Sequence, residues 1–210
     1  MQAPLAWRGA CGITRLLALG YFLAFAGAAI AGGGNVLPPT AKVHGYSLAA
    51  AAGATAYFNV GPRTPDTLPA GFPFQILYFP DDQNLTFNVR TGTMFYVPVV
   101  YSDSNDAAFW PFPDVTDPQA VSDYYFDPAQ LGAEYIDIVV DGKINSLGPS
   151  YAVGAVTPSL PSGANSYTVA AAFLAPMSKG THTVTIRGLL SGDFIGGSFS
   201  FETTYIVNVR

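Results

Sequence analysis

Cysteine, histidine and charge are all scarce in this sequence, and each shortage excludes a class of protein. The 210 residues include one cysteine and two histidines, too few for a disulfide framework or for a zinc site of clustered ligands. Charged residues make up 11% and hydrophobic residues 50%, which excludes an intrinsically disordered chain. The net charge of -5 argues against nucleic acid as a partner, because nucleic-acid-binding proteins present basic surfaces.

The motifs of the common enzyme classes are missing as well. The sequence contains neither a G-x-S-x-G nucleophile elbow nor a G-x-x-x-x-G-K phosphate-binding loop. Two carboxylates could serve as the acid and the nucleophile of a glycosidase, but nothing in the sequence singles out a pair. A non-catalytic protein is therefore the favoured interpretation, and a secreted carbohydrate-active hydrolase that uses Asp and Glu is the alternative.

The first 31 residues have the pattern of a secretory signal peptide. Arg8 and Arg15 precede an apolar run over 16–25, and Ala29-Ile30-Ala31 supplies small residues for cleavage. We expect 1–31 to be removed, which also removes Cys11. The mature protein is then exported, to the periplasm, the cell surface or the medium, and has no membrane span after cleavage.

Most of the remaining chain alternates apolar and polar residues with the period of two that is typical of strands. The clearest case is 199–209, where Phe199, Tyr205 and Val209 share one face. Asp141-Gly142 predicts a hairpin turn, and Pro98 predicts a sheet edge or a bulge. We expect strands over 55–60, 74–79, 85–89, 94–101, 136–140, 143–153, 167–173, 184–186 and 199–209.

One short helix is expected before these strands. Ser47 can serve as its N-cap, alanines follow Leu48, and Gly53 is the expected end. The predicted fold is all-β: an antiparallel β-sandwich, immunoglobulin-like or jelly-roll-like, with about nine strands and this one N-terminal helix. The predicted organisation is a flexible leader with the helix over 32–53 and a single sandwich domain over 54–210.

The last part of the chain carries a generic resemblance. The sequence from Ala175 to Gly188, followed by a terminal strand from Phe201 to Arg210, resembles the closing hairpin of immunoglobulin-like modules in exported bacterial proteins. The resemblance implies a sandwich with an adhesive or accessory role, and it brings no catalytic residues. A small outer-membrane β-barrel is an alternative, but only 199–209 approaches the strand length that such barrels need.

An acidic and aromatic stretch over 102–131 fits no strand or helix pattern. From 91 to 142 the sequence has no Lys or Arg. Calcium binds carboxylate, amide and carbonyl oxygens, so calcium is a possible cofactor here, although the spacing is not that of an EF-hand. The candidate ligands are Asp103, Asn105, Asp106, Asp114 and Asp117.

The aromatic residues of the same stretch offer a second hypothesis. Trp110, Tyr124 and Tyr125 could form a platform for sugar rings, or these residues could simply cover an open end of the sandwich. Of the two histidines, His182 is in phase with the inward residues of its strand, whereas His44 is expected at the surface.

These observations predict an exported, non-catalytic binding or structural β-sandwich module at or outside the cell envelope. Its predicted contact region is 102–131, and its predicted partner is a glycan or another envelope or extracellular protein.

Overall fold

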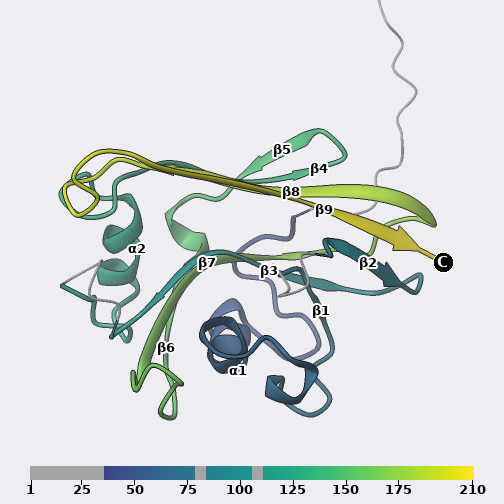
Figure 1. The fold of residues 1–210 in the computed structure, drawn as a ribbon, viewed down its shortest axis with the longest axis horizontal. Coiled ribbons are helices and arrows are strands. Elements are labelled where there is room, and N and C mark those ends of the chain that lie inside the picture. The colour runs from purple at the N-terminus through teal and green to yellow at the C-terminus, as the bar shows by residue number, and fades with distance from the viewer. Residues whose placement is uncertain (1–35, 79–83, 106–110) are drawn as a thin grey trace, which may run out of the picture. The chain divides into compact units, whose positions relative to one another are not determined.

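The computed structural model describes residues 36–78, 84–105 and 111–210 (Figure 1). The predicted signal peptide lies outside the described residues, as do Asp106 and Trp110. Among the described helices, none has the length and apolar character needed to cross a membrane.

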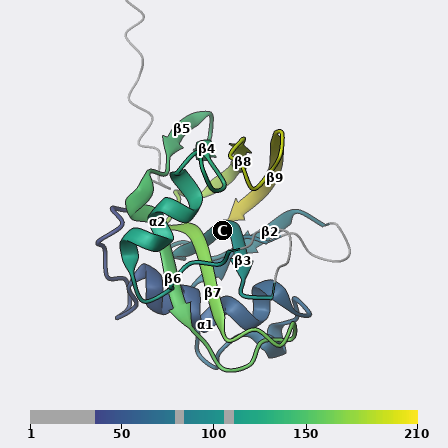
Figure 2. The ribbon, with the colours of Figure 1, turned by 90° about the vertical axis from the view of Figure 1, so that its left-hand side faces the viewer.

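Within the described residues, nine strands form two sheets (Figure 1). One sheet has four strands in the order β1 (Gln75–Ile76), β3 (Phe95–Asp103), β7 (Ser166–Leu174) and β6 (Ala152–Val156). The other has five, in the order β2 (Thr86–Val89), β9 (Phe199–Val209), β8 (Gly180–Leu190), β4 (Ala133–Val140) and β5 (Lys143–Ser146). Figure 2 shows the two sheets as stacked layers, with β5 and β9 on opposite sides of the upper one.

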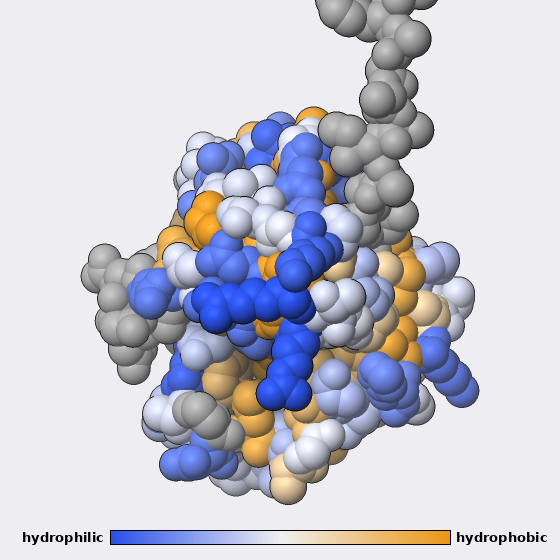
Figure 3. Space-filling view, turned by 90° about the vertical axis from the view of Figure 1, so that its right-hand side faces the viewer, coloured by the Kyte–Doolittle hydropathy of each residue, from blue (hydrophilic) through white to orange (hydrophobic). Residues whose placement is uncertain are grey.

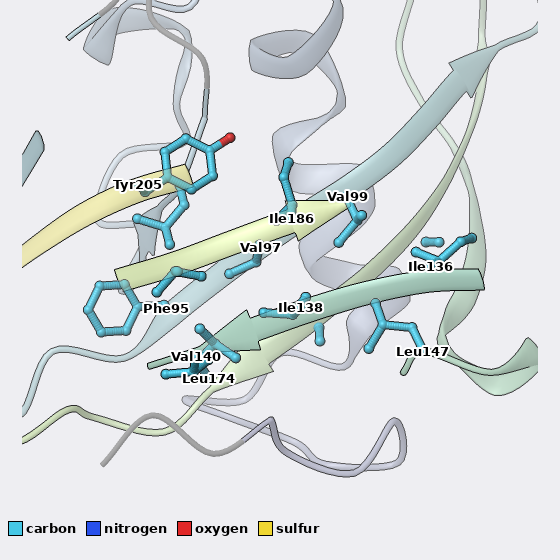
Figure 4. Close-up of a cluster of buried hydrophobic side chains, with 14 of the residues drawn as sticks. Phe95, Val97, Val99, Ile136, Ile138, Val140, Leu147, Leu174, Ile186 and Tyr205 are labelled. Atoms are coloured by element: carbon cyan, nitrogen blue, oxygen red, sulfur yellow. The ribbon is translucent and has the colours of Figure 1, made fainter. Parts of the chain in front are cut away.

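The main core lies between the sheets. Phe95, Val97 and Val99 of β3 face the side chains of β4 across the interface (Figure 4). These three residues are buried, and so are Ile136, Ile138 and Val140 of β4, as period-two alternation requires of strands that turn one face to a second sheet. The predicted β-sandwich and its number of strands are confirmed.

The sheets are mixed rather than purely antiparallel. β1 pairs with β3 in parallel, and β2 pairs with β9 in parallel, while the other pairs are antiparallel. The groups β3-β7-β6 and β9-β8-β4-β5 reproduce the strand orders B-E-D and G-F-C-C′ of immunoglobulin-type sandwiches.

Helix α1 (Leu48–Val60) covers the other face of the four-stranded sheet and forms a second core with it. Ser47 caps the helix as predicted, since its side chain accepts a hydrogen bond from the N–H of Ala50. The predicted end at Gly53 and the predicted strand over 55–60 are both wrong. A Cβ at Gly53 would lie 3.3 Å from that of Ala155, so this glycine allows the helix to approach β6 closely and does not end it.

Three further predictions about the chain's organisation need correction. The boundary drawn between 53 and 54 falls inside α1, so the helix belongs to the domain. The expected return strand over 143–153 is two strands in different sheets, because a 3-10 turn, η3 (Pro149–Tyr151), separates β5 from β6. The expected strand over 74–79 is reduced to β1 and is preceded by a second 3-10 turn, η1 (Pro65–Thr67).

The stretch over 102–131, for which no element is predicted, contains helix α2 (Pro118–Phe126). Asp117 accepts a hydrogen bond from the N–H of Gln119 at 2.9 Å, and Pro118 occupies the first turn. An Asp-Pro pair is as typical of a helix start as of a turn, and here it starts a helix.

Candidate functional site

The predicted calcium ligands are occupied by hydrogen bonds within the protein. Asp103 accepts one from the N–H of Asn105 at 2.8 Å and one from the hydroxyl of Ser162 at 2.9 Å. The Asn105 amide donates to the carbonyl of Ser162 at 2.7 Å. These contacts bring Asp103 and Asn105 together and fasten the end of β3 to the loop before β7.

The other carboxylates of the predicted site stabilise local turns. Asp114 accepts hydrogen bonds from the hydroxyl and the N–H of Thr116, which lower its pKa, and Asp117 is the N-cap of α2. Across residues 36–78, 84–105 and 111–210, no three acidic, His or Cys side chains are grouped to hold a metal ion. Of the four predicted ligands that the structure describes, it therefore brings together two, Asp103 and Asn105.

Tyr124 and Tyr125 do not form a binding platform, because both are 0% exposed. The Tyr124 hydroxyl donates to Ser102, and the Tyr125 hydroxyl lies 3.0 Å from that of Thr168. Burial raises the pKa of Tyr125 well above its ordinary range. The sugar-platform hypothesis is wrong for these two residues: α2 turns them inward, at the i, i+3, i+4 spacing that also buries Val121.

A cleft that the sequence analysis did not identify lies between β3 and β9. It consists of an apolar part of about 240 Å³ and a more polar part of about 180 Å³. The two parts share Val99, Tyr101 and Phe201. We call the apolar part the β3/β9 cleft; its lining also includes Val100, Ser102, Tyr125, Leu131, Leu190 and Phe199.

Several elements build the walls of the β3/β9 cleft. Tyr125 comes from α2, and Leu190 comes from the end of β8. Phe199 begins β9 and is 47% exposed, so an aromatic ring stands at the rim. Phe201 lies over Gly188 of β8, where an added Cβ would come within 2.6 Å of the ring. The missing side chain at Gly188 therefore leaves the space that the Phe201 ring occupies.

The more polar hollow beside the β3/β9 cleft contains a cation and two phenols. Arg63 donates a hydrogen bond to the hydroxyl of Tyr101 at 2.6 Å. Burial raises the pKa of Tyr205 to about 12, although the nearby Arg63 lowers it in part. Figure 4 shows the Tyr205 hydroxyl pointing away from the apolar core cluster.

A different polar cluster lies at the other end of the five-stranded sheet, and we call it the His182 corner. His182 is 8% exposed, which confirms its predicted inward position, whereas His44 is exposed as predicted. The His182 Nδ1 lies 2.7 Å from an Asp141 carboxylate oxygen. Its Nε2 lies 2.8 Å from the Ser178 carbonyl and 3.5 Å from the Ser178 hydroxyl.

The His182 corner has the residue types of a catalytic triad without its geometry. In a triad the imidazole accepts a proton from the serine hydroxyl, but here both ring nitrogens face stronger acceptors and donate to them. Burial lowers the pKa of His182, yet the hydrogen bonds with Asp141 and the Ser178 carbonyl outweigh burial and raise it above 6.5. With Nδ1 engaged by Asp141 and Nε2 by a backbone carbonyl, the ring has no free nitrogen to act as a general base toward the Ser178 hydroxyl.

The contacts of His182 are those of a structural clamp. It joins the chain before β8 to Asp141 in the β4–β5 turn, where Asp141 and Gly142 both have positive φ, as the predicted hairpin requires. His182 lies near the start of β8 and bonds to the carbonyl four residues before it. Figure 3 shows hydrophilic residues across the middle of the face turned to the right-hand side of Figure 1, toward which β9 ends.

Comparisons with known proteins assign no family. No family model and no curated protein matches the sequence. A search of solved structures finds the solution structure of amebosin at 11% identity. The match covers 66% of this chain and 99% of that chain with a TM-score of 0.26, too low to establish a common fold.

Proposed function

We propose that this protein is an exported, non-catalytic binding module that acts at or outside the cell envelope and contacts its partner through the β3/β9 cleft. The observation that carries the proposal is the apolar cleft itself, about 240 Å³ in volume with half-exposed Phe199 at its rim. The predicted signal peptide is the basis for export.

The cleft has the composition expected of a binding site. Protein interiors are packed with few voids larger than a water molecule, and binding sites are mostly apolar hollows with a few polar groups. Here aliphatic and aromatic residues form most of the lining, together with Ser102. Such a surface favours an apolar group of the partner over a hydrated one.

Among the predicted partners, a protein fits this surface better than a glycan does. The glycan hypothesis depends on exposed aromatic faces, and Tyr124 and Tyr125 are buried in the core. A protein side chain such as that of Leu or Phe matches both the size and the apolar character of the cleft.

The absence of catalysis is proposed from the geometry of the His182 corner. It is the described cluster that most resembles a hydrolytic site, and its imidazole donates to Asp141 and to a backbone carbonyl.

Calcium stays a prediction, and titrating the purified protein with calcium and then with a chelator tests it: a stabilising ion must raise the melting temperature.

The dye 1-anilinonaphthalene-8-sulfonate provides a probe for the cleft. We expect saturable fluorescence enhancement by the purified protein, and about a fivefold loss of affinity in Phe199→Ser, because the rim ring contributes apolar area. Tyr57→Ser is the matched control, since Tyr57 is also 47% exposed but lies on α1. Its affinity for the dye should not change.

Two results would overturn the proposal. Equal loss of dye binding in both variants, or no saturable binding, would remove the cleft as the contact region. Hydrolysis of p-nitrophenyl butyrate that disappears in Ser178→Ala would show that the protein is catalytic.

A further inference from the structure

The outer edge of β9 is only partly paired with β2. β8 pairs with β9 over its full length, from Phe199 to Val209, whereas β2 pairs on the other side with Ile206–Val209. The N–H groups of Ile206 and Arg210 donate to Leu85 and Val89 on that outer side.

The regular alternation of β9 determines which further groups face outward. Main-chain groups of alternate residues point to the same side of a strand. Because Ile206 donates outward and the β8–β9 register is unbroken, the N–H and C=O groups of Ser200 and Glu202 also point away from β8. No partner strand for these groups is found within 36–78, 84–105 and 111–210.

The facing edge of β3 is protected against strand addition. Leu77 donates to the Tyr96 carbonyl at 3.3 Å, and by the same alternation the next outward residue is Pro98, which has no N–H to offer. A bulge follows between Pro98 and Val100, so the prediction of a bulge at Pro98 is confirmed. Proline and bulges are the means by which natural edge strands avoid pairing.

The free part of β9 lies beside the apolar lining of the β3/β9 cleft. Phe199 and Phe201, which flank Ser200, both line the cleft. A strand added along this edge would therefore direct every second side chain toward the cleft.

We propose that the partner binds as an extended polypeptide segment, which adds a strand to β9 at Ser200–Glu202 and places an apolar side chain in the cleft. The inference rests on the proposed function and names its ligand: a segment with apolar residues at alternate positions. A second copy of this chain is the alternative occupant of this edge, although its own Phe201 ring already packs over Gly188 within its own sheet.

A displayed library of nine-residue segments with varied apolar residues at alternate positions tests this inference. We expect selection on the purified protein to enrich such segments. In hydrogen exchange, an enriched peptide should slow the amides of Ser200 and Glu202 by at least about tenfold, while that of Asn208, which lies beside β2, stays unchanged.

Two matched pairs separate backbone pairing from simple apolar contact. Ser200→Pro removes the outward N–H while leaving the β8 side of the strand intact, and Ser200→Ala keeps that N–H. We expect Ser200→Pro to lose peptide binding and Ser200→Ala to retain it. The same peptide, N-methylated at alternate residues, should bind at least about tenfold more weakly than the unmodified form.

The outcomes distinguish this inference from the proposed function. Dye binding without any enriched segment, or N-methylated peptide that binds equally well, overturns strand addition and leaves the cleft as a binding site. A dimer in solution whose Ser200 and Glu202 amides are protected before peptide is added assigns the edge to a second copy and also overturns the inference. If the purified wild-type protein binds neither the dye nor any peptide, the proposed function is overturned.

Discussion

The side chains at the two ends of the five-stranded sheet differ in how completely they are packed and hydrogen-bonded. At the His182 corner both ring nitrogens have acceptors, and Asp141 also accepts from the N–H of Thr183. At the β3/β9 cleft, Phe199 stands half-exposed beside unfilled apolar volume. One end is closed by hydrogen bonds between strands, whereas the other leaves apolar side chains partly uncovered.

The difference follows from what closes each end. At the corner, the hairpin turn between β4 and β5 reaches the start of β8, so the ends of three strands meet through hydrogen bonds. At the cleft the edges of β3 and β9 are unpaired within the described residues: β1 pairs with only the first residues of β3, and β2 pairs with only the last residues of β9. The remaining edges face each other over an apolar hollow.

The largest effect is expected from breaking the clamp. His182→Ala removes two hydrogen bonds of a buried ring, so we expect the free energy of unfolding to fall by about 2 kcal/mol. Denaturant unfolding of the purified protein measures this loss. Ser178→Ala is the control, and we expect it to change stability by less than about 0.5 kcal/mol, because His182 bonds to the main-chain carbonyl of Ser178. Equal losses in the two variants would contradict the clamp.

At the cleft end, the N-cap of α2 offers a smaller perturbation. Asp117→Ala removes the acceptor for the N–H of Gln119 and should cost about 1 kcal/mol of stability. Because α2 carries Tyr125 into the cleft wall, dye affinity should fall as well. Asp123→Ala, near the other end of the same helix, is the control, and its dye affinity should fall less. An equal fall in the two variants would show that the N-cap has no specific effect on the cleft.

A still smaller change in stability is expected from Gly188→Ala. The new methyl group would meet the far end of the Phe201 ring and lie 3.3 Å from the Tyr135 carbonyl. The crowding costs about 1 kcal/mol, and the better fit of Ala to a strand offsets part of this cost. Movement of the ring into the cleft should weaken dye binding several-fold. Unchanged dye affinity, measured by fluorescence titration, would show that Phe201 does not define the cleft wall.

The smallest effect is the pH dependence that one histidine imposes. The pKa of His182 is raised above 6.5 in the folded protein, so its contribution to stability is complete below pH 6.5. That contribution is lost as the pH rises through the folded pKa. Melting temperatures measured from pH 6 upward should therefore decline in the wild type, and this component should be missing in His182→Ala. The same decline in the variant would assign it to other groups.

Strand positions could be predicted from the sequence wherever one face of a strand is buried. Residues 199–209 alternate because β9 turns one face to the sandwich core, and Asp141-Gly142 specifies its turn locally. α2 was missed because Asp117-Pro118 suits a turn as well as a helix start, and the strand over 55–60 was wrong because alanine-rich sequence extends α1 beyond Gly53.

The candidate site could not be predicted in the same way. The lining of the cleft comes from four separate parts of the chain, near Val99, Leu131, Leu190 and Phe199, and strand order alone brings them together. The inward position of His182 was predictable from its phase, but its bond to Asp141 depends on β4 lying beside β8. Local pattern specifies elements, whereas pairing over long distances in the chain builds the sites.

The pairing of β2 with β9 has a consequence for how the molecule is made. Asn88 and Asn208 are 120 residues apart and lie in contact, so the five-stranded layer is incomplete until the final strand has been synthesised. Contacts between such distant segments form slowly, because the intervening chain must first lose conformational freedom. A nascent chain that lacks its last strand therefore has no finished sandwich.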